Sequence, residues 1–217
     1  TLEIENNSIK KSESESLFCS FPLIGSKKMF EFTITINSPN FEPSTERNKI
    51  FLNKKENQSI TESSVNKEIL EQSVTLFKNI VDQCINAQLN NLFFLANGLL
   101  FKNPNLFNES FDREWYTNTF IDRMHKVLEN SRIVKTIDDE KTFLKDAYFP
   151  IYEENSNKEQ REMYHKLLCH KYPNKTATFE ESESWENLLW KELHLITIDN
   201  LVSDEEALGI EKEEGKK

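Results

Sequence analysis

The side chains best suited to chemistry lie in the C-terminal half of the sequence. His165 and Cys169 are four residues apart, and His170 follows Cys169 directly, in a segment with helical periodicity. Residues four apart share one face of a helix, so this pair could ligate a metal ion or act as base and nucleophile. A metal site needs further ligands that the local sequence does not supply. We therefore expect the pair to be packed or exposed, and expect no metal site.

Glycine is too scarce for the common nucleotide-binding loops. The four glycines stand at positions 25, 98, 209 and 215, which excludes both G-x-x-x-x-G-K-[ST] and G-x-G-x-x-G. H-E-x-x-H, C-x-x-C and G-x-S-x-G are also missing from the sequence. Glu180, Glu181 and Glu183 fit a solvated helix start better than an acid–base pair. We expect no cofactor site and no self-contained catalytic site in this chain.

The charge balance is strongly acidic. Lys and Arg number 27 against 37 Asp and Glu, for a net charge of -10, and such a surface repels a phosphate backbone. We therefore expect no nucleic-acid partner, and no apolar run of about 18 residues predicts a membrane span. Cys19, Cys84 and Cys169 are far apart, as reduced thiols in a cytoplasmic protein would be. The missing initial Met and the ragged charged end suggest a piece of a longer protein.

The most strongly patterned stretch is 17–51. Apolar residues alternate with other residues over 17–23 and again over 30–37, on either side of a turn at Gly25-Ser26. Period-2 alternation predicts two half-buried strands, which we expect to form a hairpin over 17–37. A polar segment then leads to Arg47.

Helical periodicity dominates the rest of the chain. It predicts helices over about 65–89, 92–100, 110–130, 156–171 and 184–193, a hairpin at 132–144 and a strand at 194–198. Ser156 and Glu159 form a potential capping box for the fourth helix.

These elements predict an α+β fold in which a small, mostly antiparallel sheet packs on an α-rich body. We expect a flexible lead-in at 1–15, a β-hairpin region with the Arg47 loop at 16–60, the α-rich body at 61–202 and a charged tail at 203–217.

Several motifs of this sequence resemble one bacterial family. They are LFCSFPLIG, FTITINSPNFEPSTERNKIFL, WYTNTFIDRMHKVLENSRIVKT, FLKDAYFPIY and WENLLWKELHLITIDNL. Together they resemble the region that follows the ATP-binding domain in bacterial proteins of the sacsin-like, heat-shock-chaperone type. The resemblance spans most of residues 16–202.

The resemblance implies a part of a GHKL-class ATPase whose nucleotide pocket lies elsewhere. In that class an N-terminal α/β domain holds ATP and Mg²⁺ through an acidic-Asn helix and Gly-rich lid motifs, none of which occurs here. The next domain of the related chaperones extends a basic residue toward the γ-phosphate, after an apolar strand, an Asn and a short polar step. Here the corresponding run is Ile36, Asn37 and then Ser44-Thr45-Glu46-Arg47.

By this resemblance, Arg47 is the candidate γ-phosphate sensor, with Lys49 a weaker substitute. A guanidinium offers planar, permanently charged donors that suit a phosphoryl group. The match departs from the chaperones in spacing, and Asn48 follows Arg47 where they carry an acid. The alternative is that Arg47 pairs with Glu42 or Glu46 on a surface loop.

The function expected from the sequence is therefore that of a middle or linker region, not catalytic alone. It would couple the nucleotide state of a larger sacsin-like ATPase to later domains, with the N-terminal ATPase domain of the same protein as its partner and with further protein clients. The alternative is a protein-interaction module without a nucleotide role, built from the helices of 65–193.

Overall fold

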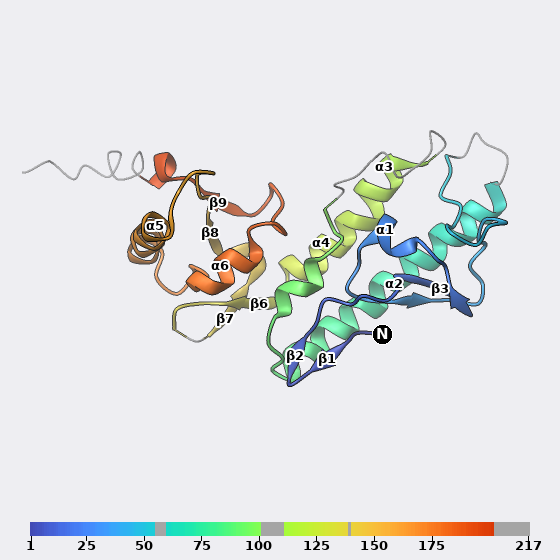
Figure 1. Ribbon diagram of the computed structural model, residues 1–217, viewed down its shortest axis with the longest axis horizontal. Coiled ribbons are helices and arrows are strands. Elements are labelled where there is room, and N and C mark those ends of the chain that lie inside the picture. Colours follow the sequence, from blue (N-terminus) through green and yellow to red (C-terminus); the bar gives the residue numbers. More distant parts are fainter. Residues whose placement is uncertain (55–59, 101–110, 139, 202–217) are drawn as a thin grey trace, which may run out of the picture. The chain divides into compact units, whose positions relative to one another are not determined.

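A computed structural model of the chain describes residues 1–54, 60–100, 111–138 and 140–201 (Figure 1). The chain divides into two compact units, Thr1–Ile133 and Val134–Lys217. Both contain helices and short strands, which confirms the α+β class and its small antiparallel hairpin. None of the described helices is long and apolar enough to span a bilayer. The expected charged tail at 203–217 lies outside the described residues.

The first unit contains a three-stranded sheet of very short strands. β3 (Leu17–Cys19) pairs antiparallel with β4 (Phe21–Pro22) and parallel with β5 (Ile36–Asn37), in the order β4-β3-β5. The antiparallel hairpin expected over 17–37 is therefore confined to 17–22.

The second expected strand is mostly replaced by other structure. Ser26–Phe30 forms the short helix α1, which ends at Glu31 in the left-handed conformation with φ of 45°. Phe30, Phe32 and the following apolar residues are buried as the alternation implied. Their backbone is packed instead against Gly98, where an added Cβ would lie 2.2 Å from the carbonyl oxygen of Phe30. The alternation thus predicted correctly that these side chains are buried, but it predicted wrongly that their backbone forms a paired strand.

One long helix, α2 (Ile60–Asn86), organises the first unit. It packs against a continuous helical segment made of α3 (Arg113–Trp115), the π-helical turn η3 (Tyr116–Ile121) and α4 (Asp122–Glu129). The short 3₁₀ helix η1 (Leu92–Ala96) lies against α4. The aromatic core between these elements consists of Phe30, Phe32, Phe77, Tyr116 and Phe120, all at most 2 % exposed.

Residues 1–15 contain a small hairpin where a flexible lead-in was expected. β1 (Ile4–Glu5) pairs antiparallel with β2 (Ser8–Ile9). Ile9 is fully buried, and its N–H donates to the carbonyl oxygen of Asn90 at 3.0 Å. This contact joins the segment to the chain that follows α2.

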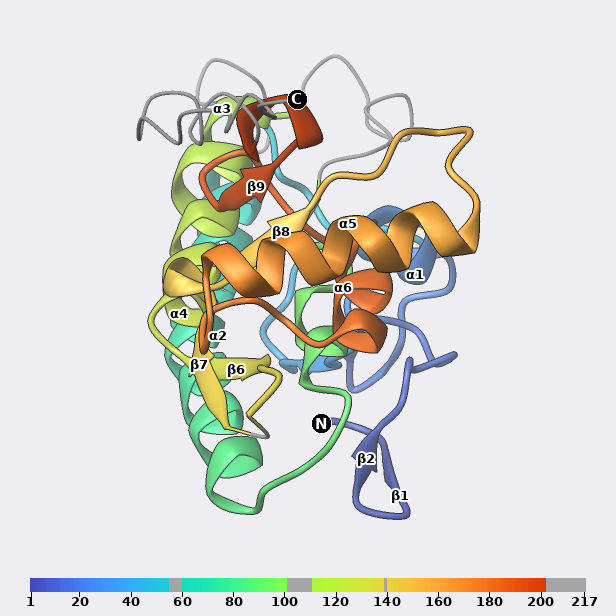
Figure 2. The same cartoon turned by 90° about the vertical axis from the view of Figure 1, so that its left-hand side faces the viewer.

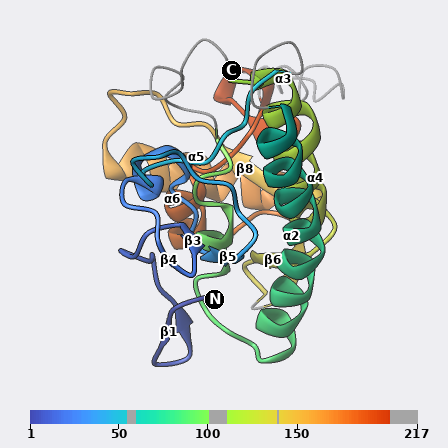
Figure 3. The ribbon, with the colours of Figure 1, turned by 90° about the vertical axis from the view of Figure 1, so that its right-hand side faces the viewer.

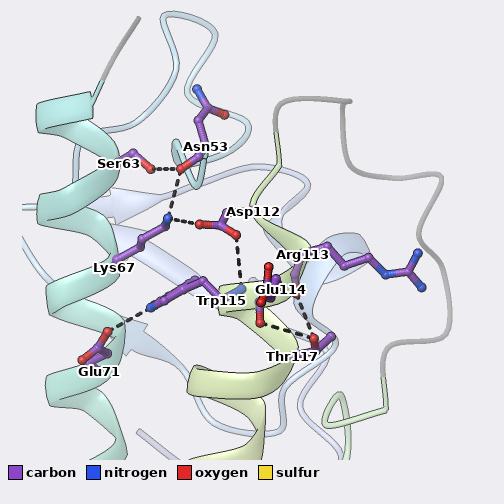
Figure 4. A network of polar contacts seen from close by, with 9 residues as sticks. All are labelled: Asn53, Ser63, Lys67, Glu71, Asp112, Arg113, Glu114, Trp115 and Thr117. Carbon is purple, nitrogen blue, oxygen red and sulfur yellow. Dashed lines mark hydrogen bonds and ion pairs between the residues drawn. The ribbon is translucent and has the colours of Figure 1, made fainter. Parts of the chain in front are cut away.

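A polar network joins α2 to the start of α3 (Figure 4). Lys67 Nζ lies 2.5 Å from Asp112 Oδ2 and also donates to the carbonyl oxygen of Asn53 at 3.0 Å. Asp112 caps α3 by accepting from the backbone N–H of Trp115. The Trp115 indole in turn donates to Glu71 on α2 at 2.9 Å. The ion pair is largely buried, with side-chain exposures of 14 % and 18 %.

The second unit is a small α+β assembly (Figure 2). β6 (Arg132–Lys135), which spans the boundary between the units, and β7 (Lys141–Phe143) form the hairpin expected at 132–144. β8 (Tyr148–Pro150) follows the 3₁₀ turn η4 (Leu144–Asp146) and pairs in parallel with β9 (His194–Ile196). Helices α5 (Lys158–Lys171) and α6 (Phe179–Trp185) complete the unit.

Two local predictions for this unit were wrong. The capping box of α5 is formed by Asn157 and Gln160, whereas Ser156 bonds back to the carbonyl oxygen of Glu153. The last helix, expected over 184–193, is instead α6: Thr178 caps its start by accepting from the N–H of Glu181, and the helix ends at Trp185.

The Lys67–Asp112 pair makes the stability of the first unit depend on pH. Burial alone raises the pKa of Asp112, but hydrogen bonds from Lys67 and the Trp115 N–H, with the charge of Lys67, lower it overall. A carboxylate with a lowered pKa in the folded state stabilises the fold above its unfolded pKa of about 3.9. That stabilisation is lost as the pH falls through the folded value.

We therefore predict that Asp112→Asn, which keeps a capping side chain, lowers the free energy of unfolding at pH 7 by about 1.5–3 kcal/mol. The deficit should shrink as urea unfolding is repeated at successively lower pH. Asp82→Asn, which removes an exposed partner of Lys78, is the control and should change stability by less than about 0.5 kcal/mol. A deficit for Asp112→Asn that is equal at every pH would contradict the electrostatic explanation.

Candidate functional site

Arg47 lies at the tip of a tight loop in the first unit. Pro43 and Ile50 form an antiparallel bridge at the base of the loop, and the Ser44 N–H donates to the Lys49 carbonyl at 2.8 Å. The Arg47 N–H donates to the Ser44 carbonyl at 2.8 Å, and Arg47 itself has φ of 52°. The loop therefore has a defined backbone, and its tip residue adopts a conformation that non-glycine residues seldom take.

The Arg47 side chain is held by a backbone carbonyl. Its Nη2 donates to the carbonyl oxygen of Cys19, at the end of β3, at 3.0 Å, and the residue is exposed. Glu46 accepts instead from the Asn48 side chain at 2.8 Å. Among the described residues, the structure pairs Arg47 with neither Glu42 nor Glu46, the partners named in the alternative to a sensor role. The guanidinium keeps donors available for an external anion, because it carries five N–H groups.

Two large apolar side chains are exposed near the Arg47 loop, Phe21 on β4 and Ile24 in the turn between β4 and α1. Phe21 is 71 % exposed and Ile24 is 73 % exposed, while Leu23 between them is fully buried. The Arg47 loop lies close to this turn, since a Cβ on Gly25 would be 3.7 Å from the Asn48 carbonyl oxygen. We call Phe21, Ile24 and Arg47 the Arg47 surface. It combines a fixed cation with apolar area that no described residue covers.

The carboxylate of Glu15 fixes the turn that carries Ile24. It accepts from the N–H of Gly25 at 2.9 Å, from the Ser26 hydroxyl at 3.1 Å and from the N–H of Lys27 at 2.8 Å. Burial raises the pKa of Glu15, but these hydrogen bonds and the charge of Lys27 lower it overall. The Glu15 carboxylate thus holds the turn through hydrogen bonds that it accepts from residues of the same unit.

The Arg47 loop is attached to α2 through one buried amide. Asn66 is fully buried, and its Oδ1 accepts from the Glu42 N–H at 2.8 Å. Its Nδ2 donates to the carbonyls of Glu42 at 2.8 Å and Phe51 at 3.0 Å. Both ends of the loop are therefore joined by a single side chain.

The sequence contains a signal for the buried Asn66, a residue that was not among the predicted site residues. Asn66 lies four residues before Leu70 and in register with the apolar face of α2 that continues through Val74 and Phe77. A polar side chain on a buried helical face needs hydrogen-bond partners. An Asn in that position therefore predicts an interior amide, although not the segment that it binds.

The His165 and Cys169 side chains do lie together on α5. His165 Nε2 is 2.7 Å from the Ala177 carbonyl oxygen, and Cys169 Sγ is 3.5 Å from His165 Nδ1. Burial raises the pKa of the Cys169 thiol, which disfavours the reactive thiolate. Among the described residues, no group of three or more His, Cys, Asp or Glu side chains could hold a metal ion. The pair therefore packs α5 against the segment that precedes α6.

The three acidic residues near 180 do not act together. Glu180 and Glu183 are exposed, whereas Glu181 accepts from the Trp185 indole at 2.9 Å. Burial raises the pKa of Glu181, although hydrogen bonds and nearby lysines partly offset this. Glu181 therefore has a packing role in α6.

The second unit has an apolar groove of about 350 Å³ beside α5. Ile151, Met163 and Ile198 line it and are 37 %, 58 % and 37 % exposed. Arg161 at its edge stacks over Tyr152 at 4.8 Å and pairs with Glu186. Its cation is thus already compensated, unlike that of Arg47.

Comparison of the chain with protein-family models, curated proteins and solved structures found no match in any of the three.

We predict that Asn66→Leu loosens the Arg47 loop. The substitution leaves the Glu42 N–H and two carbonyls without partners, at a cost of roughly 2–4 kcal/mol of unfolding free energy, given about 1–3 for each unsatisfied buried group. Hydrogen exchange at the Glu42 amide should accelerate by more than the global destabilisation explains. Asn79→Leu, at an exposed position of the same helix, is the control. Equal effects of the two variants would show that Asn66 does not hold the loop.

Proposed function

We propose that this chain is a middle or linker region of a larger sacsin-like GHKL ATPase, and is not catalytic alone. In this proposal the Arg47 surface docks on the ATP-binding domain of the same protein and reports its nucleotide state to later domains. The observation that carries the proposal is the exposed guanidinium of Arg47, held by the Cys19 carbonyl beside exposed Phe21 and Ile24. The three described cysteines, all unpaired, support a cytoplasmic location.

The geometry suits recognition of an anion that another domain presents. The loop base at Asn66 and the bond to Cys19 fix Arg47 before any partner arrives, so binding loses less side-chain freedom. The neighbouring apolar side chains would exclude water from the contact, which strengthens the attraction between a guanidinium and a phosphoryl group. The bound ATP and Mg²⁺ would supply the reacting phosphate, and Arg47 would stabilise its negative charge.

A protein-interaction module without a nucleotide role is the second candidate. The high exposure of Phe21 and Ile24 favours it, because apolar side chains of this size are typical contact anchors whatever the partner. The two candidates differ in what Arg47 does. A nucleotide role requires its charge during ATP hydrolysis, whereas a simple docking role requires only affinity.

We predict that Arg47→Ala in the full-length ATPase lowers ATP turnover by roughly 10²–10³-fold, the scale of removing one charge-stabilising donor. ATP affinity should change by less than about twofold, since the pocket itself is intact. Arg47→Lys should retain part of the turnover, because it keeps the charge but loses the planar donors. Lys78→Ala, an exposed charge removal on α2, is the control. Unchanged hydrolysis by Arg47→Ala would refute the sensor role and leave the interaction module.

We predict that Phe21→Ser combined with Ile24→Ser weakens docking to the ATP-binding domain by at least about tenfold, through lost apolar burial. Stability should stay within about 0.5 kcal/mol of the parent, since both side chains are already exposed. The measurement is calorimetric titration of the separate ATP-binding domain with this chain. Ile4→Ser, at a site 55 % exposed, should bind normally. Equal affinity of the double variant and Ile4→Ser would show that docking uses another surface.

A further inference from the structure

The apolar groove beside α5 is left uncovered by the part of the chain that the structure describes. Ile151, Met163 and Ile198 line it, and all three are exposed. Helix α5 packs against β8, the strand that leads directly into Ile151 (Figure 3). Leu167, one turn after Met163 on α5, is 46 % exposed and extends the same apolar area. Contiguous apolar area on a surface typically marks a contact with another molecule.

The size and edge of the groove suit a peptide better than a whole cofactor. Its volume is about 350 Å³, at the lower end of the roughly 300–1,000 Å³ of small-molecule sites. At its edge, the side chain of Asn155 has no hydrogen-bond partner among the described residues. Gln160 uses its Oε1 to accept from the Asn157 N–H, which leaves its Nε2 group to donate elsewhere. Such amide groups can bond the backbone of an extended segment.

Unpaired carboxylates surround the apolar area. Glu153 lines the groove, Glu154 follows it in the chain, and Asp199 follows Ile198. All three acidic residues are exposed, and none has an ion-pair partner among the described residues. The groove therefore combines exposed apolar side chains with a surplus of negative charge at its margin.

The neighbouring cations do not neutralise these carboxylates. Arg161 pairs with Glu186 at 3.4 Å, and Lys158 pairs with Glu162 at 3.8 Å. Lys166, on the next turn of α5, still leaves the acidic charges in excess. A second copy of this chain, with its net charge of -10, would be repelled at such a margin. A basic segment would be attracted, because complementary charge favours encounter and selects the partner.

We propose that the groove binds a short, extended segment of a partner protein in which apolar residues are flanked by Lys or Arg. An apolar side chain of the segment packs between Ile151, Met163 and Ile198, and the flanking cations face the three carboxylates. The two available amides at the edge bond its backbone. This contact belongs to the second unit, so it goes beyond the function proposed for the Arg47 surface.

The hydroxyl of Tyr152 supplies a further contact. Tyr152 lines the groove, and its hydroxyl oxygen is buried without a hydrogen-bond partner among the described residues. A buried polar group without a partner destabilises the structure that contains it. A backbone carbonyl of the bound segment would accept from this hydroxyl and remove that cost.

The test titrates the full chain with fluorescein-labelled peptides and follows fluorescence polarisation. The probe is Lys-Lys-Leu-Leu-Lys-Lys, and two comparison peptides replace its leucines by serine or its lysines by glutamate. The probe should bind at least about tenfold more tightly than either comparison peptide, through apolar burial and attraction that weakens as salt is raised. Equal affinity of the leucine and serine peptides would overturn the proposal, because charge alone would then explain binding. Tighter binding of the glutamate peptide would overturn it as well.

Met163→Ser should weaken binding of the probe by at least about fivefold, through lost apolar contact. Leu76→Ser, at a position of α2 that is 63 % exposed, is the matched control and should bind normally. Both side chains are exposed, so neither variant should unfold the chain. Equal affinity of the two variants would place the peptide elsewhere and overturn the proposal.

Tyr152→Phe should weaken binding by about three- to tenfold, the scale of one lost hydrogen bond. It should not lower the thermal stability of the unliganded chain, because the hydroxyl has no partner there among the described residues. Unchanged peptide affinity would overturn the assignment of this hydroxyl to the site.

Sedimentation equilibrium separates a peptide site from an interface between copies of the chain. The parent chain and Met163→Ser should give the same mass. A dimer that Met163→Ser dissociates would overturn the proposal by showing that a second copy covers the groove. These measurements use no nucleotide and no ATP-binding domain, so they succeed or fail separately from the Arg47 experiment.

Discussion

The buried amide of Asn66 is the constraint on which the first unit's surface depends. Its hydrogen bonds join both ends of the Arg47 loop to α2, the helix that carries the core. The neighbouring Lys67 holds the next segment at Asn53 and the start of α3 at Asp112. Two adjacent polar residues on one helix thus fix a long irregular segment that has almost no secondary structure of its own. Such a segment must find partners for its backbone groups elsewhere, and side chains of α2 supply them.

Hydrogen bonds and ion pairs within the fold also distinguish the charges that are matched internally from the charge of Arg47. Glu15 accepts hydrogen bonds from the backbone of the turn before α1. Asp112 accepts hydrogen bonds from Lys67 and from the backbone N–H that it caps at the start of α3. Arg161 in the second unit is matched by Glu186. Arg47 differs because its fixed partner is a neutral carbonyl. A carbonyl orients a guanidinium without cancelling its charge, which is the property that an anion-recognising arginine requires.

The sequence predicted which side chains are buried more reliably than which segments pair as strands. Alternation over 30–36 identified four buried apolar residues, yet the left-handed turn at Glu31 and the close approach of Gly98 prevent a regular strand there. The capping box of α5 was displaced by one residue because the run Ser156-Asn157-Lys158-Glu159-Gln160 contains two overlapping candidates. The Ser156 hydroxyl is taken by Glu153, so Asn157 caps the helix. Arg47 was identified from the sequence, but its contact with Cys19 depends on a separation of 28 residues, which no local pattern encodes.

A short path through β3 connects the edge of β5 with the Arg47 surface. Asn37 is in register with Phe18, and the next residue, Cys19, provides the carbonyl that holds Arg47. The ladder between β5 and β3 and the hydrogen bond from Arg47 to Cys19 therefore form one contiguous route from the edge of the sheet to the guanidinium. The position of the Arg47 side chain thus depends on the backbone of β3, which β5 holds in place by its parallel pairing.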